Sequence, residues 1–252
     1  MSTTKVPRRA TGGGTTTRVR PNRTTNATNQ KQRISLAGST AVVSDYFHYA
    51  VNCILFQRAV YDQADFKMVK KFGLQMMVVE DEAIASHIQK IIDQVRVWLL
   101  EGKLSRLVLV IQRKDDGETL ERWEFDVKIE EEDTQKENLR AQGDPNQKVP
   151  ANEDNLEPEK ELRKDKRSKS LAEIQTEIQQ IIRQIIATVS FLPIPESTRT
   201  FKVLAYTDRV GKDDTNEWKD SEAFDITDGG ERVKLKSFST SVHKVDTAVD
   251  YK

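Results

Sequence analysis

The stretch from Gly38 to about Ala59 constrains the fold more than any other part of the chain. Its spacing predicts a helix with Ser39 as the N-cap. Its large apolar residues point in nearly every direction: Tyr46, Phe47, Val51, Cys53, Ile54, Leu55 and Phe56. A helix that is apolar all round must be covered on every side. We therefore expect this helix at the centre of a domain.

Two further helices are predicted. Residues 81–101 carry apolar side chains on one side, and Gly102 ends the helix. The third helix begins at Ser170 to Glu173, which has a capping-box pattern, and ends before Pro193. One face of the third helix, an arc of about 140°, is expected to pack on a sheet. This face holds Leu171, Ile174, Ile178, Ile181, Ile182, Ile185, Ile186 and Val189.

Several strands are also predicted. "LSRLVLVIQ" and "TLERWEFDVKI" flank the turn "KDDG", which is typical of a hairpin. "GLQMMVV" and "TRTFKVLAY" are two further strands, and the final segment "VKLKSFSTSVHKV" has strand-forming residues. Helices combined with a mostly antiparallel sheet, in irregular order, indicate an α+β domain.

Two polar segments are expected to be disordered. Residues 1–33 contain 8 Lys and Arg and no Asp or Glu, which predicts a basic tail over residues 1–31. Residues 130–166 contain 6 hydrophobic residues in 37, which predicts a loop inserted in a domain spanning 32–252. The tail leaves open a nucleic-acid-binding function, although it lacks the interleaved aromatic residues of single-strand binders. We expect no specific nucleic-acid partner.

The sequence offers little for catalysis, a metal or a cofactor. The three histidines have no metal-ligand spacing. We expect His48 to be a satisfied core group, His87 to be solvated, and Cys53 to be a buried packing residue. Phosphate loops, nucleophile elbows and a paired general acid and base are not recognisable. The longest apolar run, Leu107 to Ile111, is too short to cross a membrane. A single cysteine favours a reducing compartment.

The C-terminal segment 208–252 is expected to be weakly anchored. Its large apolar residues are few: Trp218, Phe224, Ile226, Leu235 and Phe238. Each would contribute about 2 kcal/mol if buried, so the segment should open more easily than the whole domain. Four hydroxyls are candidates for phosphorylation, because added charge could bias pairing; the alternative is that they suit an exposed strand. They are Ser237, Ser239, Thr240 and Thr247.

The remaining face of the third helix has an unusual composition. Gln180, Arg183, Gln184 and Ala187 lie there, with Phe191 just beyond the helix end. An ordinary solvated face would carry Lys and Glu. Arginine among amides and beside an aromatic ring favours a protein–protein contact, and a solvated face of unusual composition is the alternative.

Several separated motifs resemble the HORMA-domain proteins of the spindle checkpoint. They are "ILFQRAVY", "LERWEFDV", "IRQIIATVSFLPIPE", "YTDR" and "SFSTSVHKV", and the resemblance runs from Ile34 to Lys252. It implies three helices packed on a mostly antiparallel sheet, with a mobile "safety belt" over 208–252. Belt residues would include Trp218, Phe238, His243 and Tyr251. In the family's open form the belt blocks the edge strand that holds Phe201, Val203, Ala205 and Tyr206. In the closed form it moves to the opposite side and wraps a partner peptide against that edge.

The resemblance also implies partners. They are peptides of the anaphase-promoting-complex activator and of a coiled-coil kinetochore receptor, with a basic residue, two apolar residues and a downstream proline. Open and closed copies would dimerise through Arg183, Gln184, Phe191 and Lys236, the last where we expect an arginine in relatives. Leu36 matches an N-terminal strand position that influences the balance of the two forms.

The family further implies an adaptor and an AAA+ remodelling ATPase as partners. It implies a location at the nucleus, kinetochore, nuclear envelope and cytoplasm. The alternative within the same fold is a HORMA adaptor subunit of a translesion DNA polymerase or DNA-repair assembly.

Overall fold

The computed structural model describes residues 34–130, 169–194, 196–208, 218–226 and 229–252. The predicted tail, and all but the first residue of the predicted loop 130–166, lie outside these described residues. The main element is a six-stranded antiparallel sheet in the order β5-β3-β4-β8-β6, with β7 paired to β8. Its strands are β3 (Leu104–Arg113), β4 (Thr119–Ile129), β5 (Arg199–Thr207), β6 (Glu231–Lys234), β7 (Phe238–Ser239) and β8 (His243–Tyr251).

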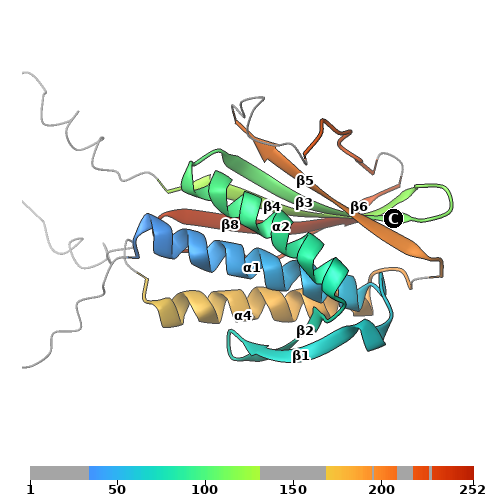
Figure 1. The fold of residues 1–252 in the computed structure, drawn as a ribbon, viewed down its shortest axis with the longest axis horizontal. Coiled ribbons are helices and arrows are strands. Elements are labelled where there is room, and N and C mark those ends of the chain that lie inside the picture. The colour runs from blue at the N-terminus through green and yellow to red at the C-terminus, as the bar shows by residue number, and fades with distance from the viewer. Residues whose placement is uncertain (1–33, 131–168, 195, 209–217, 227–228) are drawn as a thin grey trace, which may run out of the picture. The chain divides into compact units, whose positions relative to one another are not determined.

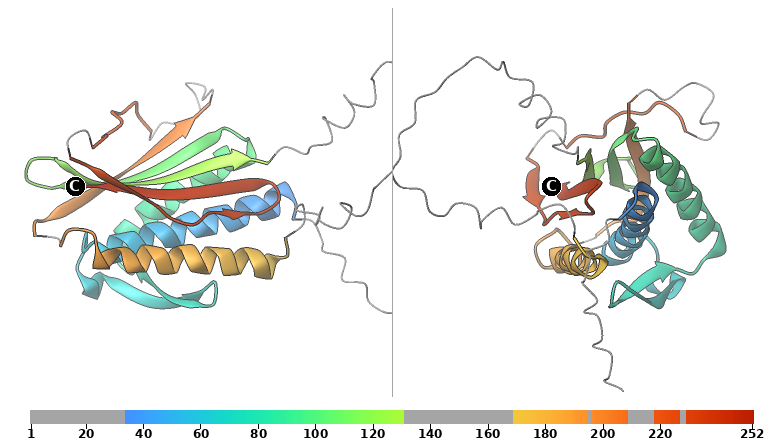
Figure 2. Two further views of the ribbon diagram at one scale, coloured as in Figure 1. Left: turned by 180° about the vertical axis from the view of Figure 1, so that it is seen from behind. Right: turned by 90° about the vertical axis from the view of Figure 1, so that its left-hand side faces the viewer.

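Three helices lie on one face of this sheet (Figure 1, Figure 2). They are α1 (Leu36–Gln57), α2 (Glu82–Leu100) and α4 (Leu171–Ala187), with 3-10 turns η1 (Gln63–Asp65) and η2 (Thr188–Ser190). Helix α1 is central, because it contacts α2, α4, β8 and strand β2 of a small hairpin. That hairpin is β1 (Phe66–Lys71) with β2 (Leu74–Val79). The predicted α+β class and central helix are confirmed, whereas the lysine-rich strand β1 was not predicted.

The predicted helix ends are confirmed for α2 and α4 but not for α1. Asp81 caps α2, and Gly102 follows its end at φ +66°, a conformation that favours glycine. Ser170 and Glu173 form the predicted capping box of α4. The N-cap of α1 is Ser35, whose Oγ accepts a hydrogen bond from the backbone N–H of Gly38 at 3.1 Å. Ser39, the predicted cap, is instead fully buried one turn further along.

Helix α4 packs differently from the prediction. Five isoleucines of the predicted face are fully buried: Ile174, Ile178, Ile181, Ile182 and Ile185. Leu171, Ile186 and Val189 are exposed, so the buried arc is narrower than predicted. The helix contacts α1 and strand β7 of the sheet, so its buried face is shared between a helix and a short strand.

The two faces of the sheet are chemically different, since successive side chains of a strand alternate. Trp123 and Phe125 face the helices and are fully buried. Glu124 lies on the opposite face, where Arg232 donates to it at 2.5 Å and to Asp250 at 2.7 Å. The face of the sheet opposite the helices therefore carries ion pairs between side chains of neighbouring strands.

The terminal strand is more firmly packed than its sequence predicted. Strand β8 lies between β4 and β6, with Val245 opposite Val127 and Val249 opposite Trp123. Val245 and Val249 are fully buried. The sequence interpretation counted only large apolar residues, whereas here small β-branched residues fill the interior positions.

Candidate functional site

The outer edge of β5 is the first component of the candidate site. On its inner side β5 pairs with β3, with Phe201 opposite Ile111, Val203 opposite Leu109 and Ala205 opposite Leu107. In the described ranges no strand pairs with its other side (Figure 1). An edge strand presents backbone N–H and C=O groups that can pair with another chain. All four residues predicted for the partner-peptide strand, Phe201, Val203, Ala205 and Tyr206, lie on β5.

A segment of the C-terminal region crosses this edge; we call residues 218–226 the strap. At one end Trp218 packs against Trp98 of α2, on the helix side of the sheet, with ring centroids 5.0 Å apart. At the other end the carbonyl of Ala223 accepts a hydrogen bond from Arg122 Nε at 3.1 Å. Arg122 neighbours Trp123 on β4 and therefore points to the charged face. The strap thus passes from one face of the sheet to the other around β5.

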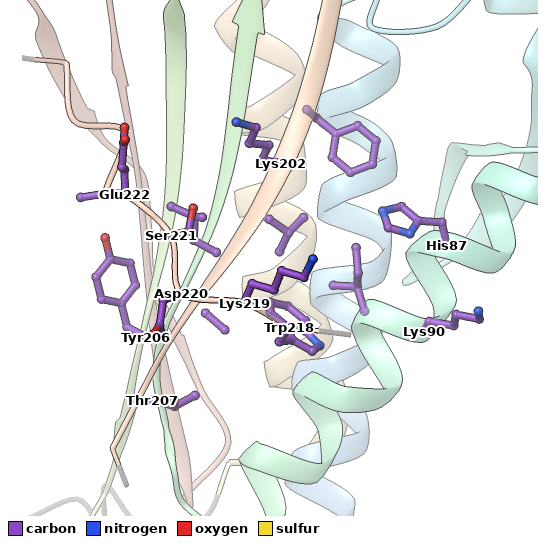
Figure 3. A pocket seen from close by; sticks show the side chains of 16 residues that line it. His87, Lys90, Lys202, Tyr206, Thr207, Trp218, Lys219, Asp220, Ser221 and Glu222 are labelled. Atoms are coloured by element: carbon purple, nitrogen blue, oxygen red, sulfur yellow. The ribbon is translucent and has the colours of Figure 1, made fainter. Parts of the chain in front are cut away.

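The strap, β5 and α2 enclose a groove of about 640 Å³. Figure 3 shows side chains of all three elements around it. Ile91, Phe201 and Val203 supply apolar surface, and the cations and carboxylates of its lining are Lys90, Lys202, Lys219, Asp220 and Glu222. Its volume is within the range of ligand sites. A groove along an unpaired strand edge suits an extended peptide.

Arg122 fixes one end of the strap, and it was not predicted. Its guanidinium also donates to the Tyr206 hydroxyl at 3.0 Å and forms an ion pair with Glu124. Only 5% of its side chain is exposed. One buried cation therefore joins β4, β5 and the strap. One sequence signal could have pointed to Arg122. It lies next to Trp123 in "LERWEFDV", where charged residues alternate with core residues along a strand.

The chain after the strap forms the belt hairpin, residues 231–251, which is tied to α1 by buried polar groups. His243 Nδ1 lies 2.7 Å from Ser39 Oγ, which also contacts the Thr240 hydroxyl. The hydroxyls of Tyr46 and Thr247 lie 2.8 Å apart. Burial lowers the pKa of His243. The alternative of exposed hydroxyls is therefore wrong for Thr240 and Thr247, which are buried.

Apolar contacts complete the docking of the belt hairpin. Phe238 is 1% exposed, and its ring lies 4.9 Å from that of Tyr46 in an edge-on arrangement. Of the other two candidate phosphorylation sites, Ser237 is exposed and Ser239 is half-buried.

The predicted dimer residues form a second surface, the α4 surface, made of Arg183, Gln184, Phe191 and Lys236. Gln184 Oε1 accepts a hydrogen bond from the backbone N–H of Lys236 at 2.7 Å. The ammonium of Lys236 donates to Gln180 Oε1 at 2.8 Å. Arg183 is exposed, and Phe191 is 45% exposed with its ring 6.2 Å from that of Tyr251. Of the four predicted residues, Gln184 and Lys236 are thus in direct contact although they are 52 positions apart in the chain.

Three single-residue expectations have mixed outcomes. Leu36 lies in the first turn of α1 and not in a strand, because Ser35 starts the helix before it. His48 is only half-buried and stacks on Tyr49, so it is not a core group. Cys53 is buried as predicted, and burial raises its pKa to about 12, which suppresses the reactive thiolate.

His87 is exposed as predicted and lines the groove. Trp98 and Trp123 are core residues. None of the helices in the described segments is long and apolar enough to cross a membrane.

This combination of a sheet with an accessible edge strand, three helices on one face and a C-terminal strap around that edge defines a HORMA domain. The family described as HORMA domain matches residues 39–243. The chain therefore belongs to the HORMA family.

Within this family the chain is similar to the Mad2 proteins. It is 41% identical to the mitotic spindle checkpoint component mad2 of Schizosaccharomyces pombe, over 88% of this chain and 96% of the relative. It is 40% identical to the mitotic spindle checkpoint component MAD2 of Saccharomyces cerevisiae, over 88% and 98%. It is 34% identical to the mitotic spindle assembly checkpoint protein MAD2A of Homo sapiens, over 88% and 95%.

Solved structures agree with this placement. A chain in the crystal structure of the mitotic checkpoint complex is 40% identical, with a TM-score of 0.66, over 85% of this chain and 99% of that chain. C. elegans HTP-2 bound to the HIM-3 closure motif has a TM-score of 0.64 at 14% identity, over 87% of this chain and 92% of that chain, which shows the fold alone.

Proposed function

We propose that this protein is a spindle assembly checkpoint switch that captures a partner peptide and catalyses no reaction. The observation that carries the proposal is the strap around β5, which encloses a groove beside the outer edge of this strand, where no other strand of the described ranges pairs. The 34–41% identity to spindle checkpoint proteins supports the cellular role.

Capture would occur by addition of a strand. An extended peptide would pair its backbone with the outer edge of β5, and alternate side chains would enter the groove. The strap would then close over it, held by Trp218 against α2 and by Arg122 on the charged face. Ile91, Phe201 and Val203 would contact the two apolar residues of the peptide.

The pairing of the belt hairpin supports the interpretation that this arrangement is the closed form. Strand β8 pairs with β4, on the opposite side of the sheet from β5. In the open form the belt hairpin would leave β4 and cover the edge of β5. A switch of this kind requires two packings within a few kcal/mol of each other. The belt hairpin would therefore be the moving element, and the peptide would stabilise the closed form, because only that form would leave the edge of β5 free.

The partners would be the anaphase-promoting-complex activator and the coiled-coil kinetochore receptor. Holding the activator would inhibit the ubiquitin ligase and delay anaphase. The α4 surface would pair open and closed copies, and an adaptor with an AAA+ ATPase would return the closed form to the open one. Function at the kinetochore, nuclear envelope, nucleus and cytoplasm follows from these partners.

Fluorescence anisotropy tests the proposal directly. A labelled peptide with a basic residue, two apolar residues and a downstream proline should bind saturably. Trp218→Ala should weaken binding at least tenfold, because one end of the strap loses its anchor on Trp98. Phe191→Ala, on the α4 surface, is the control and should bind normally. Absence of binding, or equal binding by both variants, would contradict capture beneath the strap.

A further inference from the structure

A second cavity lies where β5 begins, apart from the peptide groove. Its volume is about 290 Å³. It is formed by the end of α1, the β3–β4 hairpin, the segment between α4 and β5, and the last residue of the chain. The charged side chains in its wall are Arg58, Arg113, Glu121, Glu196, Arg199 and Lys252.

Glu121 and Arg58 form a complete ion pair within this wall. Arg58 Nε donates to Glu121 Oε1 at 2.6 Å, and its Nη2 lies 2.6 Å from the same oxygen. The second oxygen, Oε2, accepts from Trp123 Nε1 at 3.1 Å. Both side chains are 2% exposed. Both oxygens of the Glu121 carboxylate therefore already accept hydrogen bonds, one from Arg58 and one from Trp123.

Arg199 brings a second buried guanidinium to the same carboxylate. The residue is 7% exposed. Its Nη1 donates to the Arg58 carbonyl at 3.2 Å and lies 3.5 Å from Glu121 Oε1, which is a long contact. Its Nε is buried and has no hydrogen-bond partner among the described residues. Two buried cations thus share one carboxylate, which leaves a net charge of about +1. Buried charge is costly unless it is paired.

Two further cations line the mouth of the cavity, and both already have acidic partners. Arg113 lies 2.7 Å from Asp116 and 2.6 Å from Glu118, and Lys252 is ion-paired with Glu118, so these two cations add no net charge. Glu196 also lines it but is exposed. The uncompensated charge of the wall is therefore the buried one at Arg199, because Glu121 already neutralises Arg58. The group that would balance this wall is an anion with several acceptor oxygens.

The geometry points to a binding site for a tetrahedral oxyanion, with the Nε–H of Arg199 as the central donor. Guanidinium groups match phosphate oxygens in geometry and charge. The phosphate group could be free inorganic phosphate or a phosphoryl group on a peptide, and the same donors would hold either.

A bound oxyanion would link two parts of the molecule. Arg58 Nη2 donates to the carbonyl of Pro193 at 2.6 Å, two residues beyond Phe191 of the α4 surface. Lys252 directly follows β8. Occupancy should therefore stiffen the connection between the α4 surface and the belt hairpin, at a site distinct from the peptide groove.

Nuclear magnetic resonance of the full chain with ¹⁵N-labelled arginine is the test. Inorganic phosphate is added at constant ionic strength, with chloride as the reference. The Nε–H signal of Arg199 should shift saturably with phosphate and stay unchanged with chloride. N-acetyl-phosphoserine amide forms a second arm: tighter binding than inorganic phosphate would indicate a peptide-borne phosphoryl group, and weaker binding would indicate the free ion. An Arg199 signal unmoved by either probe would overturn the proposal.

Thermal unfolding gives an independent readout with a matched control. At phosphate ten times above its Kd, the Tm should rise by about 4 °C. Arg199→Gln should abolish this rise, whereas Arg232→Gln, an exposed ion-paired arginine outside the cavity, should retain it. An equal rise in both variants would overturn the site. Should Arg199→Gln fail to fold, the signal of Arg199 in the unaltered chain decides the question.

Discussion

Replacing Phe238 by alanine should release the belt hairpin while the rest of the domain stays folded. Phe238 is 1% exposed and packs edge-on against Tyr46 of α1. Truncation of a fully buried phenylalanine costs about 3–5 kcal/mol. A switching element is separated from its alternative by only a few kcal/mol. The loss is therefore comparable with the whole docking free energy, and it shifts the docked population about a hundredfold or more.

Hydrogen exchange read by mass spectrometry measures this outcome. In Phe238→Ala the amides of residues 231–251 should lose most of their protection, because the hairpin is open in most molecules. Strand β3 and helix α2 should still exchange slowly. The control is Phe191→Ala, which removes the same ring from a position that is 45% exposed. It should leave the exchange of the hairpin nearly unchanged.

Two results would refute this reasoning. The hairpin and β3 could lose protection together, in which case the hairpin would be part of one cooperative unit and could not switch by itself. Alternatively, the hairpin could keep its protection, in which case contacts other than Phe238 would hold it.

Three further predictions concern the α4 surface and the buried polar contacts of the belt hairpin. Arg183→Glu combined with Gln184→Ala should abolish self-association in analytical ultracentrifugation and leave peptide affinity unchanged; loss of both would contradict separate surfaces. The folded-state pKa of His243 is lowered by burial, so the unfolded chain takes up the proton first as pH falls below about 6.5. Unfolding free energy should therefore decrease from pH 7 towards pH 5, and a His243→Gln chain with an undiminished slope would count against this assignment. Tyr46→Phe should cost about 1–3 kcal/mol, because it leaves the buried hydroxyl of Thr247 unpaired, and adding Thr247→Val should recover part of the loss; strictly additive denaturation free energies would disprove the hydrogen bond.

Local patterns predicted most of the helices and strands. The all-round apolar surface of residues 46–56 correctly indicated a central helix. The pattern of Ser170 and Glu173 correctly predicted the N-terminal capping box of α4. The predicted start of α1 was wrong because Ser35 and Ser39, four residues apart, both suit an N-cap. The contact between Ser39 and His243 depends on the tertiary fold, which the local sequence pattern does not reveal.

The candidate site was less accessible to pattern reading. Helical projection found Arg183 and Gln184, since neighbours on a helix face are fixed by its period. It could not find Lys236, whose contact with Gln184 joins elements about fifty residues apart and was named only through the family resemblance. Arg122 and Arg199 were missed for the same reason, because a buried arginine in a strand has no local signal. Its role depends on which carbonyl or carboxylate the fold brings to it.

The most direct test of peptide capture beneath the strap is hydrogen exchange of β5 and residues 218–226 with and without a saturating synthetic peptide. The account predicts slower exchange in both segments when the peptide is bound, because β5 gains a hydrogen-bonded neighbour and the strap closes over it. The amides of α4 should be unaffected. Binding that protects α4 instead, or that leaves both β5 and the strap unchanged, would contradict the account.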